Sequence, residues 1–354
     1  MRELADLLMK KRYRRGSIDF DMPEPLIEFD EWGAMTGVSR AARNIAHRII
    51  EEFMLAANEA VAAHLATAVP ASIYRIHEKP DPKRVMDFEE VAAHFGYSLG
   101  VGAIPVQRFG VTDKRRDGGK RRHDIELAAP ELKITSRQYQ KLVAKIEGKP
   151  EERILSYLML RSLKQARYAT NNVGHFALAA DTYTHFTSPI RRYPDLVVHR
   201  LLREALDADR SRDRQGAVAT TLTEPELSAI ATECSHTERR AAEAERELVE
   251  WKKVRFMADR VGEDFDALVI STAKYGIFVE LTELFIEGLV PIDTLPGDEY
   301  TYRENVRKVV GKRTRREFSI GDRVRVVLVR IDANERKLQF AVFEESKPRR
   351  RKGR

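Results

Sequence analysis

Hydrophobic residues follow one period over the first three quarters of the chain and a different one over the last quarter. Up to about residue 261 they mostly recur every three or four positions, which is typical of helices with one buried face. We predict long helices over about residues 40–66 and 224–261, with two shorter ones between 136 and 167. After Gly262 apolar and polar residues alternate in five short segments, which predicts β-strands. The chain therefore divides into a mixed α/β part and a small all-β part.

The first long helix has an apolar stripe through Ile45, Phe53 and Val61, which we expect to face the core. Polar residues, among them Glu51 and Asn58, gather on another face. Because a single carboxylate among neutral polar groups is usually a surface feature, we interpret this second face as solvated.

The second long helix has a carboxylate within its apolar stripe. Glu245 lies between Ala241 and Leu248, and Trp251 continues the stripe. A buried carboxylate needs a cationic or hydrogen-bonding partner. Either Glu245 faces arginines on a neighbouring element, or it lies at the edge of the stripe and its carboxylate reaches solvent.

The alternating segments after Gly262 predict a small barrel of the OB type, because they are short and separated by turn residues. Basic and aromatic side chains share one face of these strands. Tyr275 and Phe278 can stack on bases there, with Lys274 beside them to attract phosphate. Isolated aromatic residues are more often part of a core, but the barrel context favours binding.

Composition indicates a globular protein of the reducing cytoplasm without a membrane-spanning segment. The 354 residues are 43% hydrophobic and 33% charged, and no apolar run is long enough to cross a bilayer. Cys234 is the only cysteine, so an intramolecular disulfide and a zinc site built on several thiolates are both excluded.

Basic residues are clustered rather than evenly spread, although the net charge is only +7. One cluster covers residues 113–123, inside an excursion at 107–126 that we expect to be a surface loop, and another forms the tail 347–354. Neither has apolar periodicity, so we expect solvated arms. Such arms contact polyanions, of which nucleic acid is the commonest inside cells, or they simply increase solubility.

Residues 185–195 combine two adjacent arginines with two prolines and the start of a helix. Pro189 fixes its own φ and restricts the residue before it, so the segment should be a rigid bend. Pro194 suits the first turn of a helix. Arg191 and Arg192 then lie at a helix N-terminus, where a guanidinium can grip phosphate or carboxylate. Local composition alone also fits a helix start with two solvated arginines.

The same segment, HFTSPIRRYPDLVVHR (residues 185–200), resembles the hallmark of the RNB family of exoribonucleases. Four further blocks agree with that family, namely RGSIDF (15–20), RIIEEFMLAAN (48–58), MLRSLKQ (159–165) and GHF (174–176). The resemblance implies an α/β (α+β) truncated RNB catalytic domain over residues 1–257, with 107–126 as an insertion. An all-β OB-fold barrel of the ribosomal-protein type would follow over 258–345, and then a basic tail over 346–354.

The resemblance also implies roles for individual residues. Arg191 would hold the scissile phosphate and Glu245 would be a carboxylate near the 3′ end, which makes these two the expected catalytic residues. Glu51 would receive the terminal ribose 2′-hydroxyl and Phe20 would stack on the last bases. The residues expected to contact RNA are Phe20, Glu51, Arg192, Tyr193, Lys274, Tyr275 and Phe278.

The implied reaction is processive 3′-to-5′ hydrolysis of RNA to nucleoside 5′-monophosphates with water activated by Mg²⁺. The family holds its magnesium through an aspartate-rich segment upstream of these blocks, and no such cluster occurs here, so we predict no metal ligands in this chain. We therefore expect the C-terminal portion of an enzyme, with little or no activity alone. The alternatives are a non-catalytic RNA 3′-end binding protein and one chain of a split nuclease. The expected partners are single-stranded RNA 3′ ends, together with a missing N-terminal half or ribosome-associated RNA.

Overall fold

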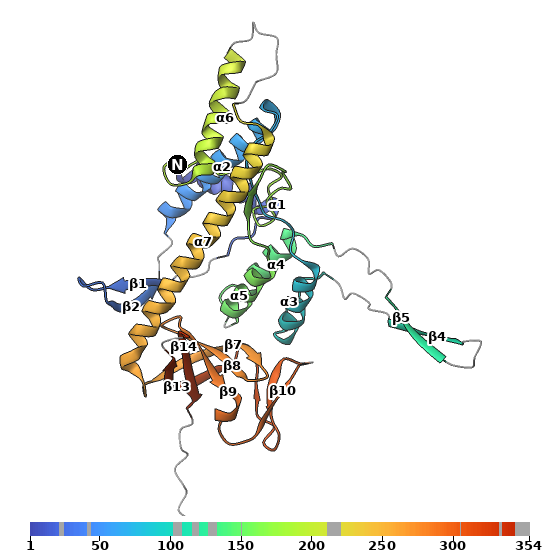
Figure 1. Ribbon diagram of the computed structural model, residues 1–354, viewed down its shortest axis with the longest axis vertical. Coiled ribbons are helices and arrows are strands. Elements are labelled where there is room, and N and C mark those ends of the chain that lie inside the picture. Colours follow the sequence, from blue (N-terminus) through green and yellow to red (C-terminus); the bar gives the residue numbers. More distant parts are fainter. Residues whose placement is uncertain are drawn as a thin grey trace, which may run out of the picture. The chain divides into compact units, whose positions relative to one another are not determined.

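The computed structural model describes residues 1–20, 25–40, 44–101, 108–114, 120–126, 133–149, 151–210, 221–304, 306–332 and 335–343. The chain divides into two compact units, whose segments can be followed in Figure 1. The first unit consists of Met1–Phe20 and Ile45–Ser235, and the second of Asp21–Asn44 and His236–Arg354. In the described part of the chain, no helix is both long and apolar enough to cross a membrane.

The first unit is mainly helical. Its elements are α1 (Arg2–Arg15), α2 (Ile45–Ala68), β3 (Tyr74–Ile76), α3 (Pro82–His94), β4 (Arg108–Lys114), β5 (Lys120–Glu126), α4 (Ser136–Ile146), α5 (Glu152–Ser162), β6 (Arg167–Ala169), α6 (Tyr193–Arg210) and the start of α7 (Glu224–Met257). A buried cluster joins α2, α6 and α7 through Leu65, Val197, Leu201 and Leu227, each at most 1% exposed. The mixed α/β class predicted from sequence is confirmed.

The predicted inward stripe of α2 is confirmed at Val61, which packs against the buried cluster, and is wrong at the start of the helix. Ile45 is 45% exposed, whereas the buried positions of the helix include Glu52 and Asn58. The reason is that both polar side chains find partners inside the unit. The Glu52 carboxylate accepts two hydrogen bonds from Arg12 of α1, and Asn58 bonds to residues far along the chain. Paired polar groups can be buried at little cost, so the helix turns a partly polar face inward.

Two other short segments differ from the prediction. Residues 107–126, expected as a surface loop, include the antiparallel pair β4–β5, with Arg108 opposite Glu126. The sequence Asp117-Gly118-Gly119 between these strands is a turn signal that the loop prediction did not use. The segment from Gly174, expected as a buried strand, forms only isolated bridges. Gly174 and Ala179 have φ values of +77° and +49°, which are incompatible with a continuous strand.

The second unit is dominated by a closed barrel with strand order β13-β14-β9-β8-β7. Its elements are β1 (Pro25–Phe29), β2 (Met35–Arg40), the rest of α7, η1 (Ala258–Arg260), β7 (Asp264–Ala273), β8 (Gly276–Leu281), β9 (Glu287–Pro291), η2 (Ile292–Thr294), β10 (Tyr300–Arg303), β11 (Lys308–Gly311), β12 (Glu317–Phe318), β13 (Arg323–Asp332) and β14 (Lys337–Val342). The predicted all-β barrel of the OB type is confirmed. Strands β10–β12, which lie between β9 and β13 in the sequence, form a separate three-stranded sheet.

The barrel core follows the period-two pattern of its strands. Val269, Val279 and Leu328 are completely buried and face the same interior. Gly288 of β9 is required for closure, because a Cβ atom there would lie 2.3 Å from the ring of Phe340. The tight packing positions β8, β9 and β14, whose outer surfaces carry one of the candidate sites.

Candidate functional site

The segment before α6 is held by hydrogen bonds that converge on Ser188. The Ser188 carbonyl accepts from the backbone N–H groups of both Arg191 and Arg192 at 3.2 and 3.1 Å. Its own N–H donates to Oδ1 of Asp195 at 2.8 Å, and Arg192 Nη2 donates to the same oxygen at 2.7 Å. Asp195 is completely buried. The rigid bend and the placement of Pro194 in the first helical turn agree with the prediction.

The side chain of Arg191 is oriented but not buried. Its Nε donates to Oγ of Ser188 at 2.8 Å, and the side chain is exposed. Ser188 thus holds Arg191 through its carbonyl and its hydroxyl, while its N–H is bonded to Asp195. A guanidinium that is held through Nε can still donate to an anion through its terminal amino groups.

A second network ties this segment to α2. The Asn58 amide, buried to 3% exposure, donates to the Tyr183 hydroxyl at 2.9 Å and accepts from the Phe186 N–H at 3.0 Å. The ring of His199 stacks on Phe186 with centroids 4.0 Å apart, and its Nε2 bonds to the Phe186 carbonyl. Asn58 therefore belongs to the support of the site, which the sequence interpretation of α2 missed.

Two histidines next to this network are held neutral. Burial, followed by the charge of Arg192, lowers the pKa of His185 to about 3. Burial, followed by the proximity of His77, lowers the pKa of His175 to about 3 as well. His185 Nδ1 bonds to the hydroxyl of Tyr168 at 2.8 Å. These rings therefore act near pH 7 as neutral packing and hydrogen-bonding groups.

A pocket of about 400 Å³ lies between α2 and the 183–192 segment, inside the first unit. Glu51 and Arg192, both singled out from sequence, line it together with Asn58, Tyr183 and His185. A carboxylate from α2 and a guanidinium from the 183–192 segment, together with aromatic rings, can receive a ligand that has hydroxyl groups, an anionic group and a flat face.

Three other predicted residues are not among those that line this pocket. Arg191 and Tyr193 lie beside it and are exposed, the latter to 51%. Phe20 is half-buried at the end of the first chain segment of the same unit, close in sequence to Ile18, whose N–H bonds to the Ala177 carbonyl at 2.7 Å.

Of the two alternatives for Glu245, the structure agrees with a carboxylate that reaches solvent, although the stripe around it is not buried. Glu245 lies in the part of α7 that belongs to the second unit, and its side chain is exposed. Leu248 and Trp251, expected on an inward stripe, are 57% and 40% exposed, whereas Leu227 is fully buried. The reason is length: 34 residues extend over about 50 Å. The helix extends beyond the core that covers its first turns, so the stripe is buried at its start and not around Glu245.

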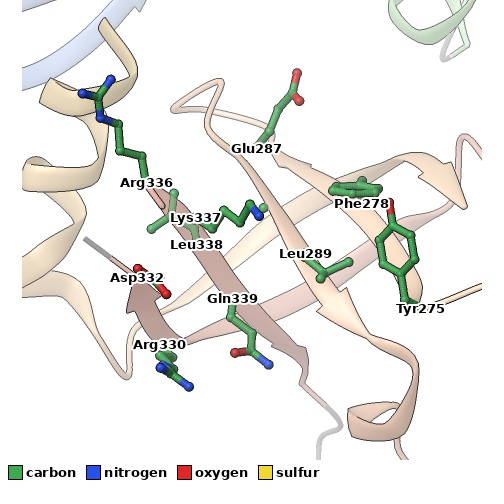
Figure 2. Close-up of a pocket in the computed structure, with 11 residues that line it drawn as sticks. Tyr275, Phe278, Glu287, Leu289, Arg330, Asp332, Arg336, Lys337, Leu338 and Gln339 are labelled. Carbon is green, nitrogen blue, oxygen red and sulfur yellow. The ribbon is translucent and has the colours of Figure 1, made fainter. Parts of the chain in front are cut away.

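A second pocket, of about 590 Å³, lies on the outer face of the barrel (Figure 2). Tyr275 and Phe278 form one side, with ring centroids 5.9 Å apart in an edge-to-face arrangement. Tyr275 is 59% exposed, and Lys274 beside it is exposed as well. The structure therefore brings the predicted aromatic pair together on a surface rather than in the core.

The basic side chains expected on this face include two that the sequence did not single out, Arg336 and Lys337. Arg330, Arg336 and Lys337 line the same pocket from β13 and β14 (Figure 2). An irregularity in the β13–β14 pairing between Leu328 and Arg330 changes the alternation, so Arg330 reaches the surface instead of the core. The detectable signal was the pair of basic residues next to the turn that begins at Asp332.

The residues around Arg191 do not fit a magnesium site. Across the described ranges, no three His, Cys, Asp or Glu side chains lie close enough together to hold a metal ion. Asp195 has one oxygen without a hydrogen bond, but the side chain is buried against Arg192. We derive no step through a metal at this position.

Comparison with known protein families matches the first part of the chain and the barrel to two separate family models. The model of the RNB domain matches residues 1–208, more than half of the chain. The chain belongs to the RNB family. A second model, the S1 RNA binding domain, matches residues 258–343 and so covers the barrel.

Relatives in the RNB family include ribonuclease R of Aquifex aeolicus, 39% identical over 98% of this chain and 44% of that protein. Ribonuclease R of Escherichia coli is 33% identical over the full chain and 40% of its own length. The chain thus spans about two fifths of these relatives. The apo form of Mycoplasma genitalium RNase R has a TM-score of 0.79 at 27% identity, over 96% of this chain and 48% of that one. The same enzyme in complex with ribose methylated single-stranded RNA has a TM-score of 0.78.

Proposed function

We propose that this chain is the RNA-holding portion of a 3′-to-5′ exoribonuclease of the ribonuclease R type. The observation that carries the proposal is the anchored guanidinium of Arg191, presented by Ser188 beside a pocket that Glu51 and Arg192 share. A fixed donor with free terminal N–H groups is suited to a phosphodiester, whose developing charge it would stabilise.

The pocket of the first unit would receive the terminal nucleotide. Glu51 would accept a hydrogen bond from the ribose 2′-hydroxyl, which gives preference for RNA over DNA. Arg192 and Tyr193 would contact the strand near the same end, and Phe20 would stack on a terminal base. Family resemblance gives Glu245, in the second unit, its own proposed catalytic role as a carboxylate near the 3′ end of the strand.

The barrel would hold the strand without reading its sequence. Stacking of bases on Tyr275 and Phe278 is tolerant of base identity, and Lys274 would attract backbone phosphate. Support comes from the relative solved with single-stranded RNA and from the match of residues 258–343 to an RNA binding domain.

Hydrolysis is proposed for the complete enzyme rather than for this chain alone. The reaction would need magnesium ions, which activate water and balance phosphate charge. Family resemblance puts their aspartate ligands upstream of the blocks found here. RNA binding by this chain and phosphodiester hydrolysis are therefore expected to be separable.

Two assays on the same purified chain test the proposal. Fluorescence anisotropy with a labelled adenylate oligonucleotide should detect binding to RNA in preference to DNA of the same sequence. E51Q should reduce this preference, because a neutral amide is a weaker acceptor for the 2′-hydroxyl. S39A on β2 (Ser39 is half-buried) serves as the control. Equal affinity for RNA and DNA would contradict the role of Glu51, and absence of RNA binding would contradict the proposal.

The second assay follows 5′-monophosphate release from the same RNA with Mg²⁺ present. We expect binding with little or no release, a result shared by the RNA portion of a longer nuclease and a non-catalytic 3′-end binding protein. Adding a separate polypeptide with the family's aspartate-rich segment distinguishes them, since only a nuclease portion would gain activity. Rapid release by the chain alone would overturn the separation of binding from hydrolysis.

A further inference from the structure

A basic loop of the second unit carries cations that the barrel pocket does not use. The loop connects β11 to β12 and contains Lys312, Arg313, Arg315 and Arg316, which we call the 312–316 loop. All four side chains are exposed. Residues 297–318 hold seven Lys or Arg and four Asp or Glu, which gives a local net charge of +3.

Lys312 and Arg313 have partners of different charge. Lys312 pairs with Glu299 at 2.5 Å, so its charge is partly balanced. Arg313 donates through Nη2 to the neutral Gly297 carbonyl at 3.2 Å. The Arg316 guanidinium lies 4.9 Å from the centroid of the Phe318 ring, which orients it.

The loop is preformed around one carboxylate. Oδ2 of Asp298 accepts from the Arg313 N–H at 2.9 Å, the Thr314 N–H at 2.5 Å and the Thr314 hydroxyl at 2.7 Å. The ends are closed by a bond from the Gly311 N–H to the Arg316 carbonyl at 2.8 Å. Hydrogen bonds from Thr314, followed by those from the Glu299 and Arg313 N–H groups, lower the pKa of Asp298 to about 2, so this anchor stays ionised under ordinary conditions. A preformed loop loses less conformational freedom when it binds a ligand.

Arg315 occupies a backbone conformation that does not suit it. Its φ is +60°, in the left-handed region that glycine or asparagine adopts more easily. An arginine there is not explained by the stability of the turn. Backbone strain of this kind is concentrated at sites that have a function.

We propose that the 312–316 loop is a second RNA contact of this chain, which binds backbone phosphates through Arg313, Arg315 and Arg316. The planar guanidinium groups match phosphate oxygens, and the loop lacks the aromatic pair that would hold bases. The inference rests on the RNA binding proposed above and divides it into two parts. Tyr275 and Phe278 stack on bases, and the loop supplies charge.

Salt dependence separates these two contributions. We compare R313Q/R315Q with K141Q/R203Q, a control that removes the same charge from exposed positions of the first unit. Affinity for a labelled adenylate oligonucleotide is measured by anisotropy at several salt concentrations. Loss of two phosphate contacts should make the slope of log K against log salt shallower by about 1.4, and weaken binding about tenfold at low salt. The Y275A/F278A variant should lose affinity with its slope unchanged, because stacking releases few counterions.

Each outcome has a separate meaning. If the unaltered chain fails to bind RNA at any salt concentration, the proposed function itself fails. If the chain binds and R313Q/R315Q behaves like K141Q/R203Q, the function stands and the loop inference is wrong. A change of slope in R313Q/R315Q alone supports the inference.

Single variants of Arg315 exclude a folding explanation. R315G removes the charge but suits the left-handed backbone, so its unfolding temperature should stay equal or rise while RNA affinity falls. R315K keeps the charge and should retain the slope. If R315G binds RNA like the unaltered chain, Arg315 has no part in binding and the proposal fails at its central residue.

Discussion

Two ion pairs on α6 have the same chemistry and different surroundings. Asp195 pairs with Arg192 at 2.7 Å, and the carboxylate side chain is 0% exposed. Asp207 pairs with Arg203 at 3.8 Å, and these side chains are 61% and 86% exposed. A carboxylate that is out of water depends on its cation, whereas a solvated one is already stabilised by water.

We therefore expect D195N to lower the free energy of unfolding by about 3 kcal/mol, because the amide leaves the partly buried Arg192 charge without its counterion. D207N should change it by less than about 0.5 kcal/mol. Urea unfolding followed by far-UV circular dichroism measures both. Equal effects of the two variants would show that Asp195 is not the anchor of the Ser188 turn.

The buried histidines predict a pH dependence of stability. His175 and His185 bind a proton near pH 3 when folded and near pH 6.5 when unfolded. Between these values the unfolded chain binds more protons, so stability rises with pH. The contribution of each neutral histidine to the free energy of unfolding should be complete above about pH 6.5. It should decrease by about 1.4 kcal/mol per pH unit as the pH falls towards 3.

Urea unfolding at pH 7, 6 and 5 tests this slope. H185Q should reduce it by the share of one histidine, and H236Q, at an exposed position of α7, serves as the control. The test compares the change of unfolding free energy with pH, not its value at one pH, because H185Q also alters the hydrogen bond to Tyr168. An unchanged slope in H185Q would mean that His185 is not held neutral.

At the scale of elements, α1 is attached to α2 by two salt bridges of unequal burial. Arg12 and Glu52 lie 2.6 Å apart with side chains 9% and 5% exposed, whereas Arg15 and Glu59, also 2.6 Å apart, are 32% and 28% exposed. R12A would leave the Glu52 carboxylate buried without a cation and should cost about 3–5 kcal/mol. R15A should cost about 1 kcal/mol, because water can reach Glu59.

The two variants are controls for each other, since they share helix, partner helix and distance. Thermal unfolding followed by circular dichroism should give R12A a clearly lower unfolding temperature than R15A. If the order is reversed, the half-exposed pair is the main attachment of α1.

Helix faces were harder to predict than helix positions. The period of apolar residues located α2 and α7 in the sequence, because periodicity is a local property. Which face is buried depends on distant residues: Asn58 bonds to Tyr183 and Phe186, which are 125 and 128 positions away. No window along α2 contains that information, so the apolar stripe was assigned inward although Ile45 is 45% exposed.

The candidate sites also divide into residues that are close in the sequence and residues that only the fold brings together. Tyr275 and Phe278 could be predicted because they lie only three positions apart, in the β7–β8 turn and on β8. Glu51 and Arg192 meet only through the fold of the first unit, and family resemblance rather than spacing identified them. Ser188 was missed as an anchor because its role comes from hydrogen bonds to three residues. A serine in a loop gives no sequence signal of such bonds.

At the scale of the whole molecule, the two units differ in secondary structure and in their spectroscopic probes. Both tryptophans, Trp32 and Trp251, belong to the second unit. Tryptophan fluorescence therefore reports on the barrel unit, whereas the far-UV helix signal comes largely from the first unit and α7. Each unit has its own buried cluster. Units with separate cores can unfold in separate steps, so the two signals need not coincide.

A substitution inside the barrel tests this independence. G288A puts a methyl group where a Cβ atom would lie 2.3 Å from the Phe340 ring, and overpacking of this kind costs about 1–3 kcal/mol. G37A on β2 of the same unit is the matched control, because its Cβ would meet only the Glu28 carboxylate at 3.7 Å. We expect G288A to lower the urea midpoint of tryptophan fluorescence and to leave most of the helix transition in place. If both signals shift together, the units unfold as one cooperative body, and RNA held at the barrel would then stabilise the Arg191 site as well.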